Sequence, residues 1–284
     1  MAQIAATEAN AAIVERWRTI AFKALFADMV AKNRILNVTQ DIAEMGDILH
    51  MKINPVPTVG DITVATGAFT AEAVTISNVD LTVNRWKYVA HDVVDIADIQ
   101  ADIDLISNFS QAHVPALGEA IEDDILALWS SATANAALGD ADAGTAFGDD
   151  LILPAILTLD NLNISTKDRS FLVPPVAVSQ LLKNDKFVDA HRTGQPKGAM
   201  TNGIMADVYG NPLYKTTRIA TSGNVRKGFY LHKEGLAVAI QRNIKIEKFA
   251  RTQFSTPVAA SVLFGSAIAR NNHSQVLNIK TTLV

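Results

Sequence analysis

The densest group of side chains that could do chemistry begins at His91. His91 and Asp92 are followed by Asp95 and Asp98, and a histidine nitrogen among carboxylate oxygens can bind a divalent cation. The group lies where a strand-like pattern changes to a helical one, so these side chains are expected on different faces. Carboxylates in a first helical turn also stabilise the helix. The simpler interpretation is a helix N-terminus, with metal binding as the alternative.

A second acidic group has the beginnings of a calcium-binding loop. Asp140 and Asp142 alternate as calcium ligands do, but Gly144 stands where a third oxygen ligand is needed. Leu151 stands where the pattern requires a bidentate glutamate. We therefore expect a solvated loop here.

The remaining candidates for catalysis lack a partner at a useful spacing. Asp123 and Asp124 are adjacent, so on a helix they point about 100° apart and cannot share one substrate. His113 falls on an apolar helix face and is expected to be a hydrogen-bonded interior histidine. His191 and His232 have no nucleophile-elbow pattern nearby, and no glycine-rich loop is followed by the Lys-Ser/Thr of a phosphate-binding loop. We expect no catalytic, cofactor or metal site, and no enzyme.

Composition narrows the class further. The chain has 284 residues, a net charge of −4 and no cysteine, so disulfides and thiolate sites are excluded. Hydrophobic residues make up 49% and the mean hydropathy is +0.16, which leaves room for apolar surface between subunits. The sequence contains no cluster of Lys and Arg residues, which argues against tight binding of nucleic acid. The first ten residues do not resemble a signal peptide and no apolar run would span a bilayer, so we expect a chain made in the cytoplasm.

The helices and strands that would position these candidate residues follow one another in an unusual order. Residues 7–37 have helical apolar spacing, and residues 46–94 alternate like strands around a polar, small-residue segment at 54–75. A lone two-stranded ribbon is marginal in water, so it needs something outside itself to lie on. From about residue 95 to 133 the spacing is helical again, with Pro115 expected to kink this helix or to start a second one.

The second half of the sequence reads as a compact α+β region followed by strands. Residues 151–235 contain a short helix, a buried strand at 171–173, a helix through Leu181 and a hairpin around residues 209–212. Residues 236–284 are rich in strand-like runs. No internal repeat is present.

This order of parts resembles the major capsid proteins of tailed bacteriophages, which have the Hong Kong-97-type fold. The local matches are Leu159-Asp160, Asn163-Ile164, Arg169, Phe171, Val173, Pro174-Pro175, Leu181-Leu182, and then Gly203-Ile204, Gly210, Leu213 and Tyr214. The resemblance implies an N-terminal arm at 1–45, an extended E-loop at 46–94, and a peripheral domain with a spine helix at 95–150. It further implies an axial domain at 151–235 and a return to the peripheral sheet at 236–284.

The same resemblance implies a function and partners. The chain is expected to assemble with itself, through pentamers and hexamers, into the icosahedral shell around a double-stranded DNA genome. Implied partners are a separate scaffolding protein, a portal protein, a decoration protein and packaged DNA in weak contact, with no membrane. The expected locations are the virion and, during assembly, the host cytoplasm. The residues expected at contacts between subunits are Trp17, Phe22, Phe26, Phe69, Trp86, Tyr209 and Asn211.

Two other functions stay open from the sequence. An encapsulin-like bacterial compartment would use the same fold but would carry a groove for a cargo peptide. An α/β enzyme would place its active site within residues 151–235. Electron microscopy of the overexpressed protein separates shells from small discrete particles.

Overall fold

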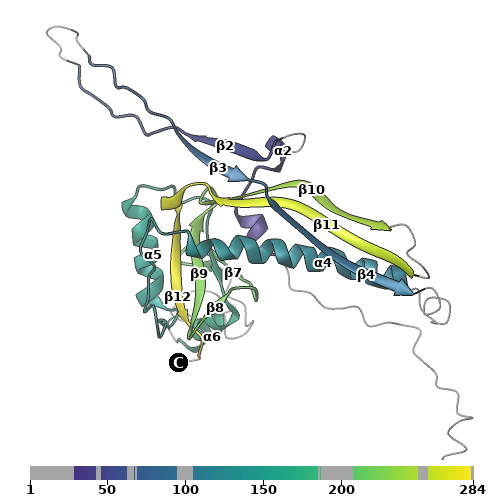
Figure 1. Cartoon of the computed structure of the whole chain (residues 1–284). Coiled ribbons are helices and arrows are strands. Elements are labelled where there is room, and N and C mark those ends of the chain that lie inside the picture. The colour runs from purple at the N-terminus through teal and green to yellow at the C-terminus, as the bar shows by residue number, and fades with distance from the viewer. Residues whose placement is uncertain are drawn as a thin grey trace, which may run out of the picture.

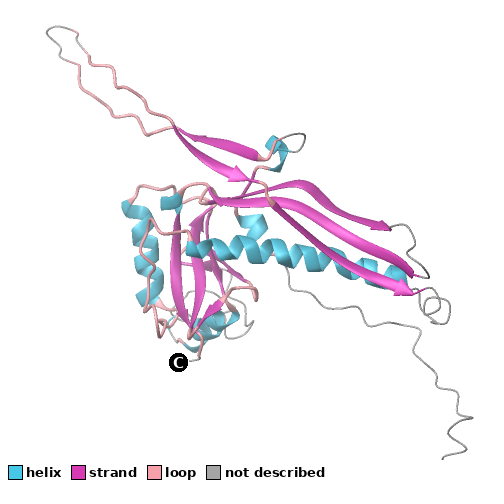
Figure 2. Ribbon diagram, in the orientation of Figure 1, coloured by secondary structure: helices cyan, strands magenta, loops and turns pink. Residues whose placement is uncertain are grey.

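The computed structural model describes residues 29–42, 46–62, 67, 69–94, 105–184, 186, 207–248 and 255–282. Its two main sheets lie side by side, and a thin ribbon extends away from both (Figure 1). Figure 2 shows that long strands and one long helix make up one part, while shorter strands and helices make up the other. The fold is therefore a mixture of helices and sheets, as the sequence predicts.

The first part is a four-stranded sheet in the order β1-β10-β11-β4. Its strands are β1 (Leu36–Asn37), β10 (Leu236–Lys248), β11 (Ser255–Ile268) and β4 (Arg85–Val94). β1 runs parallel to β10, and the other neighbours are antiparallel. The helix α4 (Leu105–Leu126) packs against β4, β10 and β11 and covers one face of this sheet (Figure 1).

The helix α4 runs without interruption through Pro115, so the expectation that Pro115 starts a second helix is wrong. Proline deletes one interior hydrogen bond, but the rest of the ladder and the packing on the sheet hold the helix together. At 22 residues the helix is about 33 Å long. The helix η2 (Ala127–Ser130) follows it directly, and residues 95–104 of the predicted helix lie outside the described residues.

The second part is a six-stranded sheet in the order β12-β9-β5-β7-β6, with β8 paired to β9. Its strands are β5 (Arg169–Val173), β6 (Asp207–Val208), β7 (Asn211–Lys215), β8 (Thr221–Ser222), β9 (Val225–His232) and β12 (Ser274–Lys280). The helices α5 (Asp149–Asn161) and α6 (Pro175–Lys183) pack beside it, and the helix η3 (Asn271–His273) precedes β12. The predicted strand, helices and hairpin of this region are confirmed.

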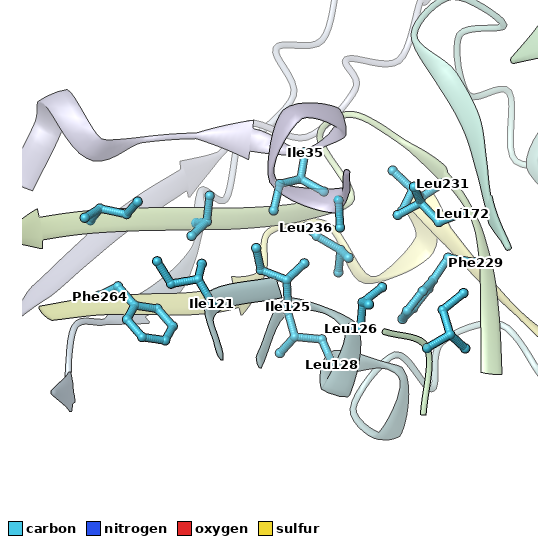
Figure 3. Close-up of a cluster of buried hydrophobic side chains, with 14 of the residues drawn as sticks. Ile35, Ile121, Ile125, Leu126, Leu128, Leu172, Phe229, Leu231, Leu236 and Phe264 are labelled. Carbon is cyan, nitrogen blue, oxygen red and sulfur yellow. The ribbon is translucent and has the colours of Figure 1, made fainter. Parts of the chain in front are cut away.

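One apolar core joins the two sheets (Figure 3). Ile121 and Ile125 of α4 lie in the same cluster as Phe264 of β11 and as Leu172 and Phe229 of the second sheet. Each of these side chains is at most 2% exposed. Burying a side chain of this size contributes roughly 1.5–3 kcal/mol, so the shared core fixes the two sheets as one unit.

A third part is the ribbon of β2 (Ile48–Ile53) and β3 (Ser77–Thr82), which pair from Ile48↔Thr82 to Ile53↔Ser77. Its base lies on the main body: Leu81 and Val83 are buried with Ala237 and Ala239 of β10. Gly265 of β11 lies directly below this crossing, where a Cβ would collide with the Thr82 carbonyl. The outgoing strand matches the sequence prediction, and among the described residues the packing on the main body is at the base of the ribbon.

Three sequence-based placements are wrong. Residues 85–94 were expected in the E-loop, but β4 pairs with β11 in the four-stranded sheet. Residues 274–280 were expected in the returning peripheral sheet, but β12 pairs with β9 in the other sheet. The helix expected through residue 37 is replaced by η1 (Ala31–Arg34), an extended Ile35 and β1, before α2 (Thr39–Ile42). In each case pairing with a distant strand decides the outcome, and local periodicity does not record it.

Candidate assembly surfaces

The loop between β2 and β3, residues 54–76, is the most exposed part of the described chain. We call it the distal loop. Val56, Val59 and Phe69 are 90%, 94% and 77% exposed. Its two arms are joined where the Thr58 amide donates to the Glu72 carboxylate at 2.8 Å. Exposed apolar side chains of this kind favour binding to another protein surface, because the free energy falls when that surface removes them from water.

The charged side chains of the distal loop are all acidic. Asp61 and Glu72 are its only ionisable side chains, and it contains no Lys or Arg. A complementary surface would therefore be apolar with a neutral or basic rim.

The face of the four-stranded sheet opposite α4 exposes two aromatic side chains. Trp86 and Tyr88 lie two residues apart on β4 and are 69% and 74% exposed. Side chains alternate along a strand, so the residue between them, Lys87, points to the other face. There its Nζ lies 2.7 Å from Asp124 of α4. Trp86 is thus exposed at the surface of the described subunit, and its contact with another subunit stays a prediction.

The other aromatic contact predicted in the second half, Tyr209, lies at the tip of a tight hairpin. Tyr209 and Gly210 both have positive φ angles, 50° and 75°, between β6 and β7. This geometry is typical of a two-residue type I′ turn. Tyr209 is 46% exposed, and its hydroxyl donates to Asp149 at 2.6 Å.

Asn211, by contrast, is held inside the subunit. It is 8% exposed, its Oδ1 accepts from the Tyr230 hydroxyl at 2.9 Å, and its Nδ2 donates to the Tyr209 carbonyl at 3.1 Å. The structure gives Asn211 the role of supporting the hairpin that presents Tyr209. Trp17, Phe22 and Phe26 lie outside the described residues.

The acidic face of α4 connects separate parts of the fold. Asp123 and Glu119 form ion pairs with Arg218, which follows β7. The next residue, Asp124, faces Lys87 and Arg85 of β4 instead. The prediction that Asp123 and Asp124 diverge is confirmed. The hydrogen bond to Asp123, with the charges of Glu119 and Glu122 behind it, raises the pKa of Arg218.

The two described side chains considered for metal binding, His91 and Asp92, have different partners. His91 contacts His113 of α4, whereas Asp92 accepts a hydrogen bond from Ser255 at 2.9 Å. Asp95 and Asp98 lie outside the described residues. Within the described ranges, no group of three or more His, Asp or Glu side chains is arranged to hold a metal ion.

The candidate calcium loop is closed by its own backbone. Asp140 Oδ1 accepts hydrogen bonds from the amides of Asp142 and Ala143, each at 2.8 Å. These bonds lower the pKa of Asp140. The carboxylate therefore stabilises the turn, in agreement with a solvated loop.

The sequence did not identify Glu122 or Arg218 as important residues. Glu122 is an acidic residue of α4, yet it is 1% exposed. A signal was present four residues earlier: a glycine within a helix, Gly118, often marks a close approach of another segment. Arg218 lies in a loop without any motif, so only the folded chain brings it to Asp123.

Among the helices that the structure describes, none combines the length and apolar composition needed to cross a bilayer.

A pocket at the start of α5 is lined by Phe147, Gly148, Asp149 and Lys183 among others. Asp149 is already bonded to Tyr209 and Lys186 there, so this carboxylate has a structural role.

Comparison with known proteins places this architecture. No protein-family model matches the sequence, and no curated protein matches it. A chain of Mycobacterium phage Che8 is 22% identical, with a TM-score of 0.76 over 93% of this chain and 96% of that chain. A chain from the capsid of cyanophage P-SCSP1u is 15% identical, with a TM-score of 0.75 over 95% and 93%.

A third solved structure, the capsid of a native GTA particle, contains a chain that is 11% identical to this one. Its TM-score is 0.74, covering 98% of this chain and 99% of that chain. The likeness thus extends over the ribbon, both sheets and the long helix. The chain has the Hong Kong-97-type fold of phage capsid proteins.

Proposed function

We propose that this protein is the major capsid protein of a tailed phage, which assembles through pentamers and hexamers into an icosahedral shell around double-stranded DNA. The observation that carries the proposal is a capsid fold over nearly the whole chain, combined with a long loop that extends away from the body of the subunit and exposes apolar side chains (Figure 1). A loop with Val56, Val59 and Phe69 at least 77% exposed is costly for a protein that remains monomeric.

Assembly would remove this unfavourable exposure of apolar side chains. In a shell, the distal loop of one subunit lies on its neighbour and buries its apolar side chains there. Trp86 and Tyr209 are proposed to add contacts, from the outer sheet face and the hairpin tip. Head-to-tail contacts of this kind close into rings when the rotation between subunits permits.

The corrected sheet membership also refines the proposed parts. The E-loop is residues 46–84, since β4 belongs to the peripheral sheet. The axial domain includes β12 in addition to residues 151–235. The proposed partners are other copies of the chain, a scaffolding protein, a portal protein, a decoration protein and, weakly, the packaged DNA, since the net charge of −4 disfavours tight phosphate binding.

Electron microscopy of the overexpressed protein tests this proposal. Shells, tubes or rings of several subunits are expected, and shells that form with the phage's packaging proteins should contain DNA. Small discrete particles under all conditions would contradict an assembly function. Closed shells that take up a protein cargo in place of DNA would contradict the phage assignment.

A further inference from the structure

Glu122 of α4 holds a segment that lies about ninety residues earlier in the chain. Its Oε1 accepts from the amides of Val30 at 3.1 Å and Ala31 at 2.9 Å. Its Oε2 accepts from Ala31 at 3.0 Å and more weakly from Lys32 at 3.4 Å. Three successive backbone amides thus converge on one carboxylate, which is a strong, charge-assisted arrangement.

The same face of α4 is shaped for this segment. Gly118 lies one turn before Glu122, and a Cβ there would lie 2.5 Å from the sulfur of Met29. The absence of a side chain at Gly118 therefore leaves space for Met29. On the other side of the contact, Ala31 is buried in the same cluster as Ile35, Ile121 and Ile125. Figure 3 labels the three isoleucines. We call Met29–Lys32 the arm root and Gly118 with Glu122 its seat.

The hydrogen bonds from the arm root satisfy the buried Glu122 carboxylate. A carboxylate that is 1% exposed is unfavourable unless its oxygens are hydrogen-bonded, and the arm root supplies those bonds. The nearby cation, Arg218, is held by Asp123 and Glu119, and Thr216 Oγ1 lies at the limit of hydrogen bonding from Glu122, at 3.5 Å. Because Glu122 binds backbone amides, it fixes the path of the chain whatever the side chains of the arm are.

We propose that Glu122 is a positioning residue for shell assembly. Gly118 and Glu122 hold the arm root in one place, so that the chain joins the body of every subunit at the same point and in the same direction. This proposal rests on the proposed shell function and adds a residue through which the N-terminal arm acts.

The first test compares Glu122→Gln with Glu119→Gln in the full chain. Both remove one negative charge from α4, but Glu119 forms an ion pair with Arg218, whereas Glu122 accepts hydrogen bonds from the arm root. Glu122→Gln should raise the subunit concentration needed for assembly by about tenfold or more, since an amide group would face three amide donors. It should also expose the bonds after Lys32 and Arg34 to trypsin in free subunits. An equal effect of both variants, or no effect of Glu122→Gln, would overturn the proposal.

The second test holds the arm root in place without Glu122. The chain has no cysteine, so Met29→Cys with Gly118→Cys offers a single disulfide between arm root and seat. In the Glu122→Gln background, oxidation should restore assembly and reduction should abolish it again. If mass spectrometry shows the disulfide formed and assembly stays weak, holding the arm root in place does not account for the effect of Glu122, and the proposal is wrong. If the parent chain itself never assembles, the proposed shell function fails instead, which the parent control reveals directly.

Discussion

Nδ1 of His91 lies 2.6 Å from Nε2 of His113, which joins β4 to α4 across the main core. The two rings are nearly parallel, with an interplanar angle of 12°. A bond between two imidazole nitrogens holds one proton, so the pair is compatible with neutral rings and not with two charged ones. His113 is fully buried, and its Nδ1 has no hydrogen-bond partner in the described part of the chain. The predicted interior position is confirmed, but the histidine is only half hydrogen-bonded.

This pair predicts loss of stability in acid. Burial, with the neighbouring His91, lowers the pKa of His113 below its usual 6.5. The unfolded chain therefore binds a proton near pH 6.5, where the folded chain does not yet do so. The contribution is fully present above pH 6.5 and is lost as the pH falls from there toward the folded pKa. His273, whose pKa is lowered by burial with Arg270 and His232, acts in the same direction.

Urea unfolding of free subunits at pH 7.5 and pH 5.5 checks this. We expect a lower midpoint in acid, and a smaller difference for His113→Leu. His50→Gln is the matched control, because His50 is exposed on the ribbon, paired with Asp80. A difference in His113→Leu as large as that of the parent would contradict the account.

The distal loop should matter for assembly and not for folding. Phe69→Ser should leave the thermal midpoint of the free subunit unchanged, because Phe69 is 77% exposed there. In assembly it should cost at least ~2 kcal/mol per contact, the burial of one large apolar side chain. Light scattering measures the assembly threshold, and Phe69→Tyr, which keeps the ring, is the control. An unchanged threshold for Phe69→Ser would remove this loop from the contacts.

Arg218 is expected to fasten the second sheet to α4. Arg218→Gln breaks its ion pairs with Asp123 and Glu119 and should lower the free energy of unfolding by about 1 kcal/mol, since the pairs are partly exposed. Denaturant unfolding measures this. Arg242→Gln, which breaks a more exposed pair with Glu247, should change it less. The opposite ranking would contradict the role of Arg218.

Mature shells should contain no covalent links between subunits through the distal loop. An isopeptide bond needs a lysine amine, and residues 54–76 contain none. Lys52 lies opposite Asn78 at the outer end of the paired strands, and Lys87 lies on β4 and faces Asp124. Arginine cannot replace lysine, because its guanidinium stays protonated. Boiled in detergent, mature particles should run as one 30.5 kDa band. A ladder of multimers would be the contrary result and would first implicate Lys52.

Local sequence patterns predicted where the helices and strands lie better than they predicted which strands pair with each other. The alternation at Ile48–Ile53, the apolar run at 171–173 and the hairpin at 209–212 each gave the observed structure. β12 was placed in the wrong sheet because its apolar sequence suits either one, and pairing with β9 is decided by the folded chain. Glu122 was missed for a similar reason: its partners are backbone amides ninety residues away, which leave no trace in side-chain spacing.

Sedimentation velocity over a wide range of protein concentration tests the central claim most directly. The account predicts that the parent chain forms rings or closed shells of many subunits as concentration rises. It predicts that Phe69→Ser shifts this transition to higher concentration. A single 30.5 kDa species at every concentration, for parent and variant alike, would contradict the account.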